Sequence, residues 1–224
     1  MASKVLRIFD GKVSWFTKIL MFAALALWAA TPFARAEAFQ IVGFGDSLMA
    51  GYQLETGAGF PEQLERALRE RGYEVAVTNA GVSGDTTSGG LSRLDWSVPD
   101  GTDLVILELG ANDMLRGIMP EATEQNLEKM IQRLKERNIG ILLVGMYAAP
   151  NLGEDYAARF NAIYPRLAEK HGLPFVPFFL EGVAAEPELQ LADGMHPNAK
   201  GVERMVENVL PVIEPLVARG GKTM

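Results

Sequence analysis

Short apolar runs alternate with amphipathic stretches along the chain from residue 37 onward. The apolar runs predict strands at 39–44, 74–80, 104–109, 139–146 and 174–179. Stretches with helical spacing predict helices at 60–71, 86–94, 121–138, 155–171 and 201–217. In the first helix Phe60, Leu64 and Leu68 fall on one side, and Gly72 follows as the expected stop. Pro211 predicts a kink or a break in the last helix.

The order of these elements indicates the class of fold. Strand and helix take turns, which predicts an α/β protein with a mostly parallel sheet. The runs at 104–109 and 141–144 are apolar on both faces, as central strands of such a sheet are. Ligands in these folds bind beyond the carboxyl ends of the strands, so chemistry is expected in the residues that follow each strand.

The first 36 residues differ from the rest of the chain. A basic beginning leads into an uncharged apolar run at 19–30, and Ala34-Arg35-Ala36 follows with a small residue at each end. This layout predicts a signal peptide at 1–36, a domain at 37–224, and a periplasmic or secreted protein with no stable membrane insertion after cleavage. The alternative is an uncleaved anchor, but a run of 12 residues is shorter than the roughly 20 that a span needs.

Composition and charge exclude several classes of protein. The 224 residues suit one domain with a substantial core. They include 21 basic and 28 acidic residues, of which five basic and one acidic lie in the first 36, so the remainder has a net charge of −11. This acidity disfavours nucleic acid and anionic membrane surfaces as partners. The chain has no cysteine, which excludes a disulfide framework, a thiol nucleophile and a Cys-based metal site.

Three known glycine-containing sequence motifs are incomplete in this chain. The dinucleotide fingerprint that begins at Gly43 lacks its third glycine, because Leu48 stands there. The G-x-S-x-G nucleophile elbow lacks its second glycine, where Met49 stands. The segment 221–223 ends like a phosphate loop, but Leu216 occupies the first glycine position and no strand precedes it.

Ser47 and His196 are the candidate nucleophile and base. Ser47 lies in a tight turn after the first strand; the alternative role is that of a helix-capping serine. Asp193 precedes His196 by three residues, so its carboxylate can keep one ring nitrogen protonated and leave the other to accept the serine proton. The alternatives are an incidental histidine in a polar turn and, more weakly, a metal site. The other histidine, His171, is expected to cap a helix at the surface.

Asn112 and Gly84 are candidate stabilisers of negative charge. Asn112 follows the third strand, and its side-chain amide can donate a hydrogen bond to a developing oxyanion. Gly84 offers a backbone N–H that a larger residue would shield. The alternative for both is a role in a turn, which asparagine and glycine favour. Asp46 is expected to brace the turn beside Ser47 rather than to act as a catalytic acid.

These residues together form an ordered pattern that closely resembles the SGNH subgroup of the GDSL hydrolases. The matching blocks are 45–48, 79–86, 110–113 and 193–198, and the resemblance spans about residues 40–215. It implies a flavodoxin-like three-layer α/β/α sandwich with five parallel strands, and no metal or organic cofactor. It also implies a catalytic triad of Ser47, Asp193 and His196, and an oxyanion hole made of Ser47, Gly84 and Asn112.

The surrounding sequence narrows the branch of this family. Segments 47–52, 161–165 and 177–180 resemble the periplasmic multifunctional thioesterase, arylesterase and lysophospholipase group. The resemblance implies a small acyl ester or acyl thioester as substrate, and a monomer is the favoured state. The loop 147–153, with Ala149 and Pro150, is expected to flank the acyl group, although its small apolar residues also suit a simple exposed loop. The alternatives are a carbohydrate O-acetyl esterase and a non-catalytic binding module.

Overall fold

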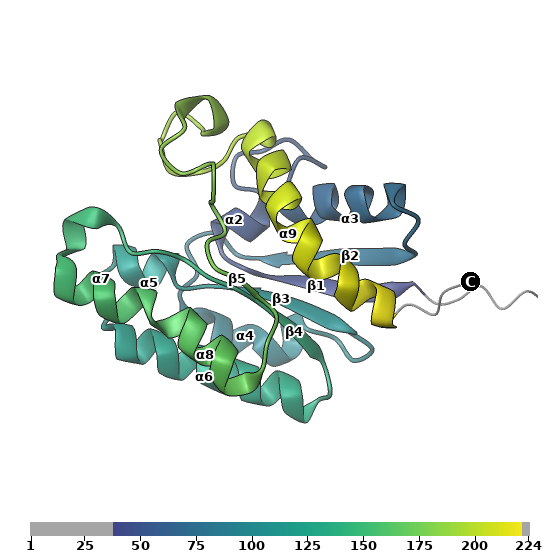
Figure 1. Ribbon diagram of the computed structural model, residues 1–224, viewed down its shortest axis with the longest axis horizontal. Coiled ribbons are helices and arrows are strands. Elements are labelled where there is room, and N and C mark those ends of the chain that lie inside the picture. Colours follow the sequence, from purple (N-terminus) through teal and green to yellow (C-terminus); the bar gives the residue numbers. More distant parts are fainter. Residues whose placement is uncertain (1–37, 221–224) are drawn as a thin grey trace, which may run out of the picture. The chain divides into compact units, whose positions relative to one another are not determined.

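The computed structural model describes residues 38–220, and the predicted signal peptide and its cleavage point lie outside these residues. Five parallel strands form one sheet in the order β2-β1-β3-β4-β5 (Figure 1). The structure thus confirms the five-stranded parallel sheet. The strands, in chain order, are β1 Phe39–Gly45, β2 Val75–Gly81, β3 Leu104–Glu108, β4 Gly140–Val144 and β5 Phe175–Val176.

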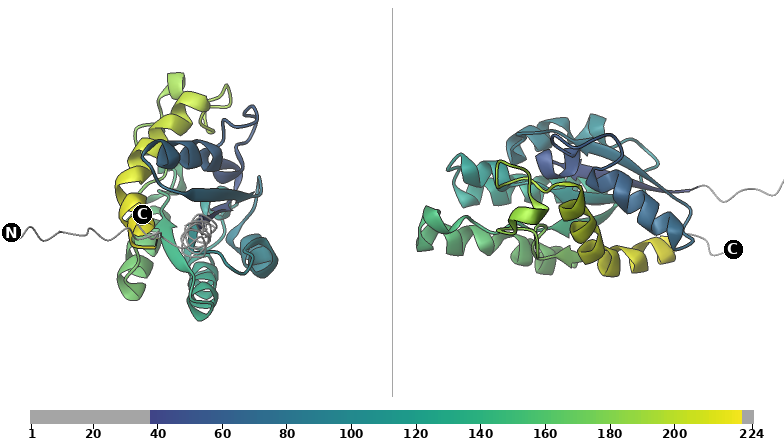
Figure 2. Two further views of the ribbon diagram at one scale, coloured as in Figure 1. Left: turned by 90° about the vertical axis from the view of Figure 1, so that its right-hand side faces the viewer. Right: turned by 90° about the horizontal axis from the view of Figure 1, so that it is seen from above.

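Helices cover both faces of this sheet, as expected for a three-layer sandwich (Figures 1 and 2). One face carries α3 (Phe60–Glu70) and α9 (Ala199–Gly220), which pack on each other. The other face carries α4 (Thr87–Ser97), α6 (Pro120–Glu136) and α8 (Ile163–His171). The chain passes from β1 to β2 in one direction along the sheet and then from β2 to β3, β4 and β5 in the opposite direction. Because the crossovers are right-handed, this reversal places the connecting helices on opposite faces of the sheet. Among residues 38–220, no helix combines the length and apolar character that crossing a membrane requires.

The central strands are buried on both sides. All five residues of β3 are buried, and so are residues 141–144 of β4. Strands covered on both faces bury apolar side chains in each direction, which is why these runs are apolar throughout. The exception is Glu108, a carboxyl group in the last position of β3 that is only 2% exposed.

Prolines account for two of the differences between the predicted and observed elements. The predicted helix 155–171 is two helices, α7 (Glu154–Asn161) and α8, because Pro165 has no N–H for the carbonyl of Asn161 and fits only in the first turn of a new helix. The fifth strand keeps two residues of the predicted 174–179, since Pro174 and Pro177 cannot donate to the sheet.

The predicted break at Pro211 does not occur. Helix α9 continues through Pro211 and Pro215, which are both exposed on the solvent side. The buried side chains of this helix, among them Val209, Ile213 and Val217, keep packing against the core along the same line. Packing of the buried face therefore outweighs the lost backbone hydrogen bonds, whose free carbonyls lie toward water.

Candidate active site

The loops after β1, β2 and β3 meet the turn 193–198 at the carboxyl edge of the sheet. In the register, Gly45 and Gly81 are opposite each other, so the loops that follow β1 and β2 start side by side. A cavity of about 410 Å³ opens at this edge, and Ser47, Gly84, Asn112 and His196 are among the residues that line it. The fold therefore brings together four candidates that are up to 149 residues apart in the sequence.

Ser47 is the first residue of a short helix, α2 (Ser47–Ala50), which the sequence patterns did not predict. Asp46, and not Ser47, caps this helix: its Oδ1 accepts the backbone N–H of Leu48 at 3.0 Å. The hydroxyl of Ser47 is thus available to another partner, and it lies 2.9 Å from Nε2 of His196. The helix-capping role considered for Ser47 belongs to its neighbour.

Asp193 holds His196 from the other side of the ring. Its Oδ2 lies 2.7 Å from Nδ1 of His196, while its Oδ1 accepts the backbone N–H groups of Met195 and His196. These hydrogen bonds, the backbone N–H of His196 first, lower the pKa of Asp193 to about 2. The ring of Tyr52 packs against the imidazole with centroids 4.5 Å apart. A carboxylate with a lowered pKa and an aromatic neighbour therefore define the orientation of the His196 ring.

Three hydrogen-bond donors belong to residues that line the cavity, namely Ser47, Gly84 and Asn112. The backbone N–H groups of Ser47 and Gly84 donate to no acceptor among residues 38–220. Gly84 has φ +80°, which a side chain would disfavour, and its carbonyl accepts a hydrogen bond from Arg116 at 2.6 Å. The third donor is Nδ2 of Asn112, which also donates to Oδ2 of Asp46 at 2.9 Å. Asp46 thereby orients the amide of Asn112.

Asn112 lies in a short helix, α5 (Ala111–Leu115), that the sequence patterns did not predict either. The next residue, Asp113, is 1% exposed and anchors this helix. Its Oδ2 accepts the backbone N–H of Thr87 at 2.7 Å, and its Oδ1 accepts the hydroxyl of Thr123. These contacts tie α5 to α4 and α6, so the position of Asn112 is determined by two other helices.

A pair of buried acids lies beneath Ser47. The backbone N–H of Asp46 donates to Oε2 of Glu108 at 3.2 Å, and Asp46 is fully buried. Burial raises the pKa of Asp46 to about 6. Burial, together with the nearby charge of Asp46, raises the pKa of Glu108 well above its usual value. The expected brace role of Asp46 fits this geometry, whereas Glu108 was missed; its only sequence signal is an acid that ends an apolar run.

His171 has no place in this site. It is the last residue of α8, and its Nε2 lies 2.9 Å from Oε2 of Glu128. Its side chain is 11% exposed, so it is more buried than the predicted surface cap. Within the described part of the chain, no three His, Asp or Glu side chains are grouped as metal ligands would be. The alternative of a metal site at His196 therefore gains no support from these residues.

The chain matches a family of known proteins over the segments that form the candidate site. Residues 44–204 match the GDSL-like Lipase/Acylhydrolase family. The chain belongs to this GDSL/SGNH hydrolase family. The match starts before Ser47 and ends after His196, so it spans every block of the candidate site.

Individual GDSL hydrolases resemble the chain over most of its length. Esterase TesA of Pseudomonas aeruginosa is 38% identical over 89% of this chain and 98% of that protein. The Thioesterase 1/protease 1/lysophospholipase L1 of Escherichia coli K12 is 34% identical over 93% of this chain and 97% of that protein. The crystal structure of AlinE4, an SGNH-hydrolase family esterase, is 46% identical and superposes with a TM-score of 0.69, covering 85% of this chain and all of AlinE4.

One of the two residues predicted to bind the substrate does not line the cavity of this GDSL hydrolase. Ala149 lines the cavity, but Pro150 is exposed and is not part of its wall. Pro150 begins a short 3₁₀ turn (Pro150–Leu152). The wall also includes side chains that the sequence reasoning did not predict there, namely Tyr52, Met114, Leu115, Met146, Leu180 and Met195.

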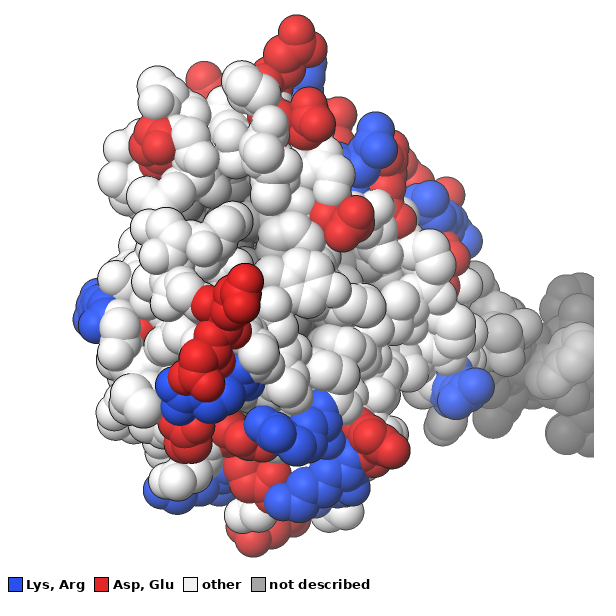
Figure 3. All heavy atoms as spheres, turned by 60° about the vertical axis from the view of Figure 1, so that its left-hand side comes forward, with Lys and Arg blue, Asp and Glu red and all other residues white. Residues whose placement is uncertain are grey.

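The surface around the cavity of this GDSL hydrolase carries few charges. Figure 3 shows the side on which the carboxyl ends of the strands lie, where uncharged surface separates acidic side chains at the top from a denser group of basic and acidic side chains in the lower part. Leu115 and Met195 line the cavity and are about half exposed, at 56% and 51%. An apolar entrance of this kind favours the apolar part of a substrate over a charged one.

Proposed function

We propose that this GDSL hydrolase cleaves acyl esters and acyl thioesters through an acyl-enzyme formed on Ser47. The observation that carries the proposal is the pair of contacts made by His196, which lies 2.9 Å from the hydroxyl of Ser47 and 2.7 Å from the carboxylate of Asp193. This geometry lets one ring nitrogen accept the serine proton while the other is held protonated. A binding module has no need of such an arrangement.

The reaction follows from these contacts in two halves. Oγ of Ser47 attacks the acyl carbonyl as Nε2 of His196 takes its proton, and the carbonyl oxygen becomes an oxyanion. The N–H groups of Ser47 and Gly84 and the amide of Asn112 stabilise that oxyanion. His196 then protonates the leaving alcohol or thiol. In the second half a water molecule, deprotonated by His196, attacks the acyl-enzyme and releases the acid.

The substrate class rests on the cavity and on the relatives. Thioether, aliphatic and small side chains surround Ser47, among them Met114, Met146 and Leu180, and they suit an acyl chain better than a sugar. The relatives are named as an esterase and as a thioesterase and lysophospholipase. We also propose that residues 1–36 direct export and are removed after Ala36.

The test uses the full chain, expressed and purified as wild type, as Ser47→Ala and as the control Ser92→Ala. Ser92 lies on α4, and its hydroxyl donates only to the carbonyl of Ser88. We expect the wild type and Ser92→Ala to hydrolyse p-nitrophenyl esters of medium or long acyl chains, palmitoyl-CoA and a lysophospholipid. Loss of the nucleophile should lower kcat by at least about 10³-fold.

Two results would contradict parts of this proposal. Turnover confined to acetylated xylan would keep the mechanism and replace the substrate by an O-acetylated carbohydrate. Absence of turnover dependent on Ser47 with every substrate would overturn the enzymatic proposal. The mass of the purified protein tests the export signal, because cleavage after Ala36 leaves a chain that begins at Glu37.

A further inference from the structure

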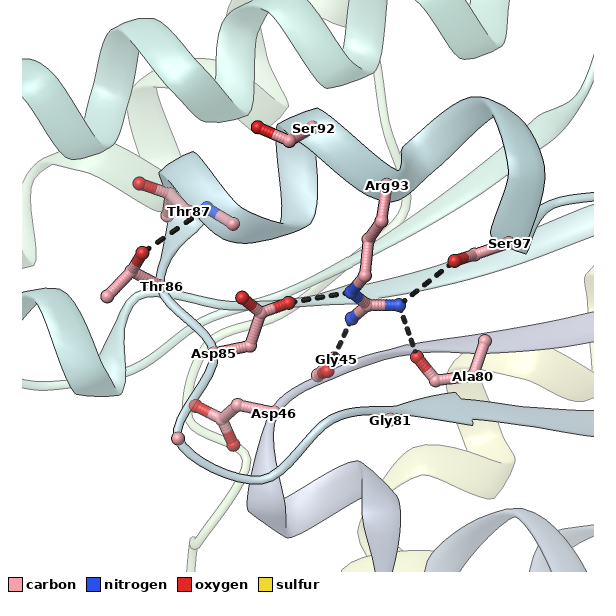
Figure 4. A network of polar contacts seen from close by, with 12 residues as sticks. Gly45, Asp46, Ala80, Gly81, Asp85, Thr86, Thr87, Ser92, Arg93 and Ser97 are labelled. Carbon is pink, nitrogen blue, oxygen red and sulfur yellow. Dashed lines mark hydrogen bonds and ion pairs between the residues drawn. The ribbon is translucent and has the colours of Figure 1, made fainter.

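Arg93 is a buried cation beneath the candidate oxyanion hole, and the proposed reaction assigns it no role. It lies on α4 and is only 7% exposed. Its Nε binds Oδ2 of Asp85 at 2.7 Å, and its guanidinium carbon lies 4.0 Å from the centre of the Phe44 ring. Figure 4 shows the guanidinium between α4 and the ends of β1 and β2.

The other nitrogens of this guanidinium bind backbone carbonyls of two neighbouring strands. Nη2 donates to the carbonyl of Gly45 at 2.9 Å, and Nη1 donates to the carbonyl of Ala80 at 2.8 Å (Figure 4). Nη1 also contacts the hydroxyl of Ser97 at 3.3 Å. Gly45 ends β1 two residues before Ser47, so this contact holds the strand that carries the proposed nucleophile.

The ion pair with Asp85 extends the same contacts to the second loop. Asp85 directly follows Gly84, whose N–H is a proposed oxyanion donor. One side chain thus binds the backbone before Ser47 and the residue after Gly84. Because both contacts use the same rigid, planar group, they determine how far apart the two loops lie.

The helix that carries Arg93 is shaped to accommodate this arrangement. Gly89 and Gly90 lie inside α4, where each glycine costs about 1 kcal/mol relative to alanine. A side chain at Gly89 would overlap the carboxylate of Asp85, and one at Gly90 would overlap Leu109. The two glycines therefore give the carboxylate and the core the space that this close approach requires.

Stability alone is a weak reason to keep such an ion pair. The side chains of Arg93 and Asp85 are 9% and 10% exposed, so both have lost most of their contact with water. Burying two charges costs about as much as their attraction returns, and apolar replacements of buried ion pairs are often as stable. A role in holding the two loops at a fixed distance explains why Arg93 and Asp85 are both present.

We propose that Arg93 is a positioning residue that sets the spacing between the N–H groups of Ser47 and Gly84. The inference rests on the proposed function, because that function makes these groups two of the three oxyanion donors. A donor displaced by about 1 Å no longer points at the oxyanion, and the loss of one donor costs about 10²–10³ in kcat. Lysine, with a single ammonium on a flexible chain, cannot bind all four acceptors at once.

The kinetic test compares Arg93→Met and Arg93→Lys with the control Arg137→Met. Arg137 also binds a backbone carbonyl and a carboxylate, those of Val98 and Asp100, in the loop that leads into β3. We expect kcat per active site, titrated with a serine-reactive phosphonate, to fall by about 10²-fold in Arg93→Met, with a smaller loss in Arg93→Lys. KM should change by less than about threefold, and the control should match the wild type.

A second measurement does not depend on turnover. Backbone amide NMR resonances of Ser47 and Gly84 should shift in both Arg93 variants and stay unchanged in Arg137→Met. If Arg93→Met does not fold, Arg93→Lys and Asp85→Asn carry both measurements, because each weakens the ion pair and keeps a polar group there. Added methylguanidinium should restore part of the activity of Arg93→Ala.

The outcomes separate this inference from the proposed function. Unchanged Ser47 and Gly84 resonances, or an unchanged kcat per titrated site, would overturn the positioning role. A wild type without Ser47-dependent turnover would overturn the proposed function, and the amide resonances would still decide whether Arg93 positions the two loops.

Discussion

Replacing Asp46 is expected to stabilise the folded protein at neutral pH and to slow catalysis. The carboxylate of Asp46 is buried and accepts two hydrogen bonds, from the backbone of Leu48 and from the amide of Asn112. An asparagine has one acceptor oxygen and one amide group in the same place, so it can accept only one of these bonds. The change Asp46→Asn therefore removes a buried charge and also disturbs either the cap of α2 or the orientation of Asn112.

The size of the stability effect follows from the pKa. Burial raises the pKa of Asp46 from 3.8 to about 6, so the folded protein binds a proton that the unfolded chain has lost. The stability that this proton confers is present below about pH 4 and disappears as the pH rises through about 6. A difference of about two pKa units corresponds to about 3 kcal/mol, of which about 2 kcal/mol falls between pH 4.5 and 7.5.

The assay is urea unfolding of the wild type and Asp46→Asn at pH 4.5 and at pH 7.5. We expect the free energy of unfolding of the variant, relative to the wild type, to rise by about 2 kcal/mol between these pH values. Glu108 adds to this rise, because burial and the charge of Asp46 raise the pKa of Glu108, and Asp46→Asn removes that charge. The kcat for a p-nitrophenyl ester should fall by at least about 10-fold.

Two results would refute this reasoning. A difference in unfolding free energy that does not change with pH would mean that Asp46 does not carry a raised pKa in the folded protein. A variant with the kcat of the wild type would mean that Asp46 does not orient Asn112 or the start of α2.

Two further changes test the base and the sign of the pH dependence. In Asp193→Asn, an amide that donates to Nδ1 would place the imidazole proton on Nε2, so kcat should fall by about 10⁴-fold with little change in KM; a loss below tenfold would contradict the role of Asp193. Glu128 behaves oppositely to Asp46: burial would raise its pKa, but hydrogen bonds from His171 and then Lys170 lower it to about 2. Glu128→Gln should therefore be about 1–3 kcal/mol less stable at pH 6 by urea unfolding, with the difference shrinking as the pH falls from 4.5 toward 2; a constant difference would contradict this pKa.

The α/β class, the parallel sheet and the place of the site could be predicted from the sequence pattern, whereas the three-layer order was implied by the resemblance to the GDSL hydrolases. Apolar runs separated by amphipathic helices permit few arrangements, and right-handed crossovers bring the carboxyl ends of parallel strands to one edge. For that reason Ser47, Gly84 and Asn112, each placed after a predicted strand, were expected together. Asp193 and His196 are three residues apart in one turn, so the contact between their side chains could be expected from the sequence alone.

Other features depend on contacts between distant segments and have no local signal. Glu108 and Arg93 look like an ordinary charged end of a strand and an ordinary helix residue, yet both are buried beneath the site. The wall of the cavity combines side chains from separate loops, which is why Pro150 was predicted there and Leu180 was not. The continuation of α9 through Pro211 likewise depends on the core that the helix covers.

The sequence by itself thus determined the α/β class, the parallel sheet and the residues that follow its strands, because hydrophobic period and turn chemistry are properties of short segments. The tertiary structure decided which charges are buried, which side chains line the cavity and how Arg93 joins the loops of Ser47 and Gly84. These depend on the distances between strands and helices, and such distances exist only once the core has packed.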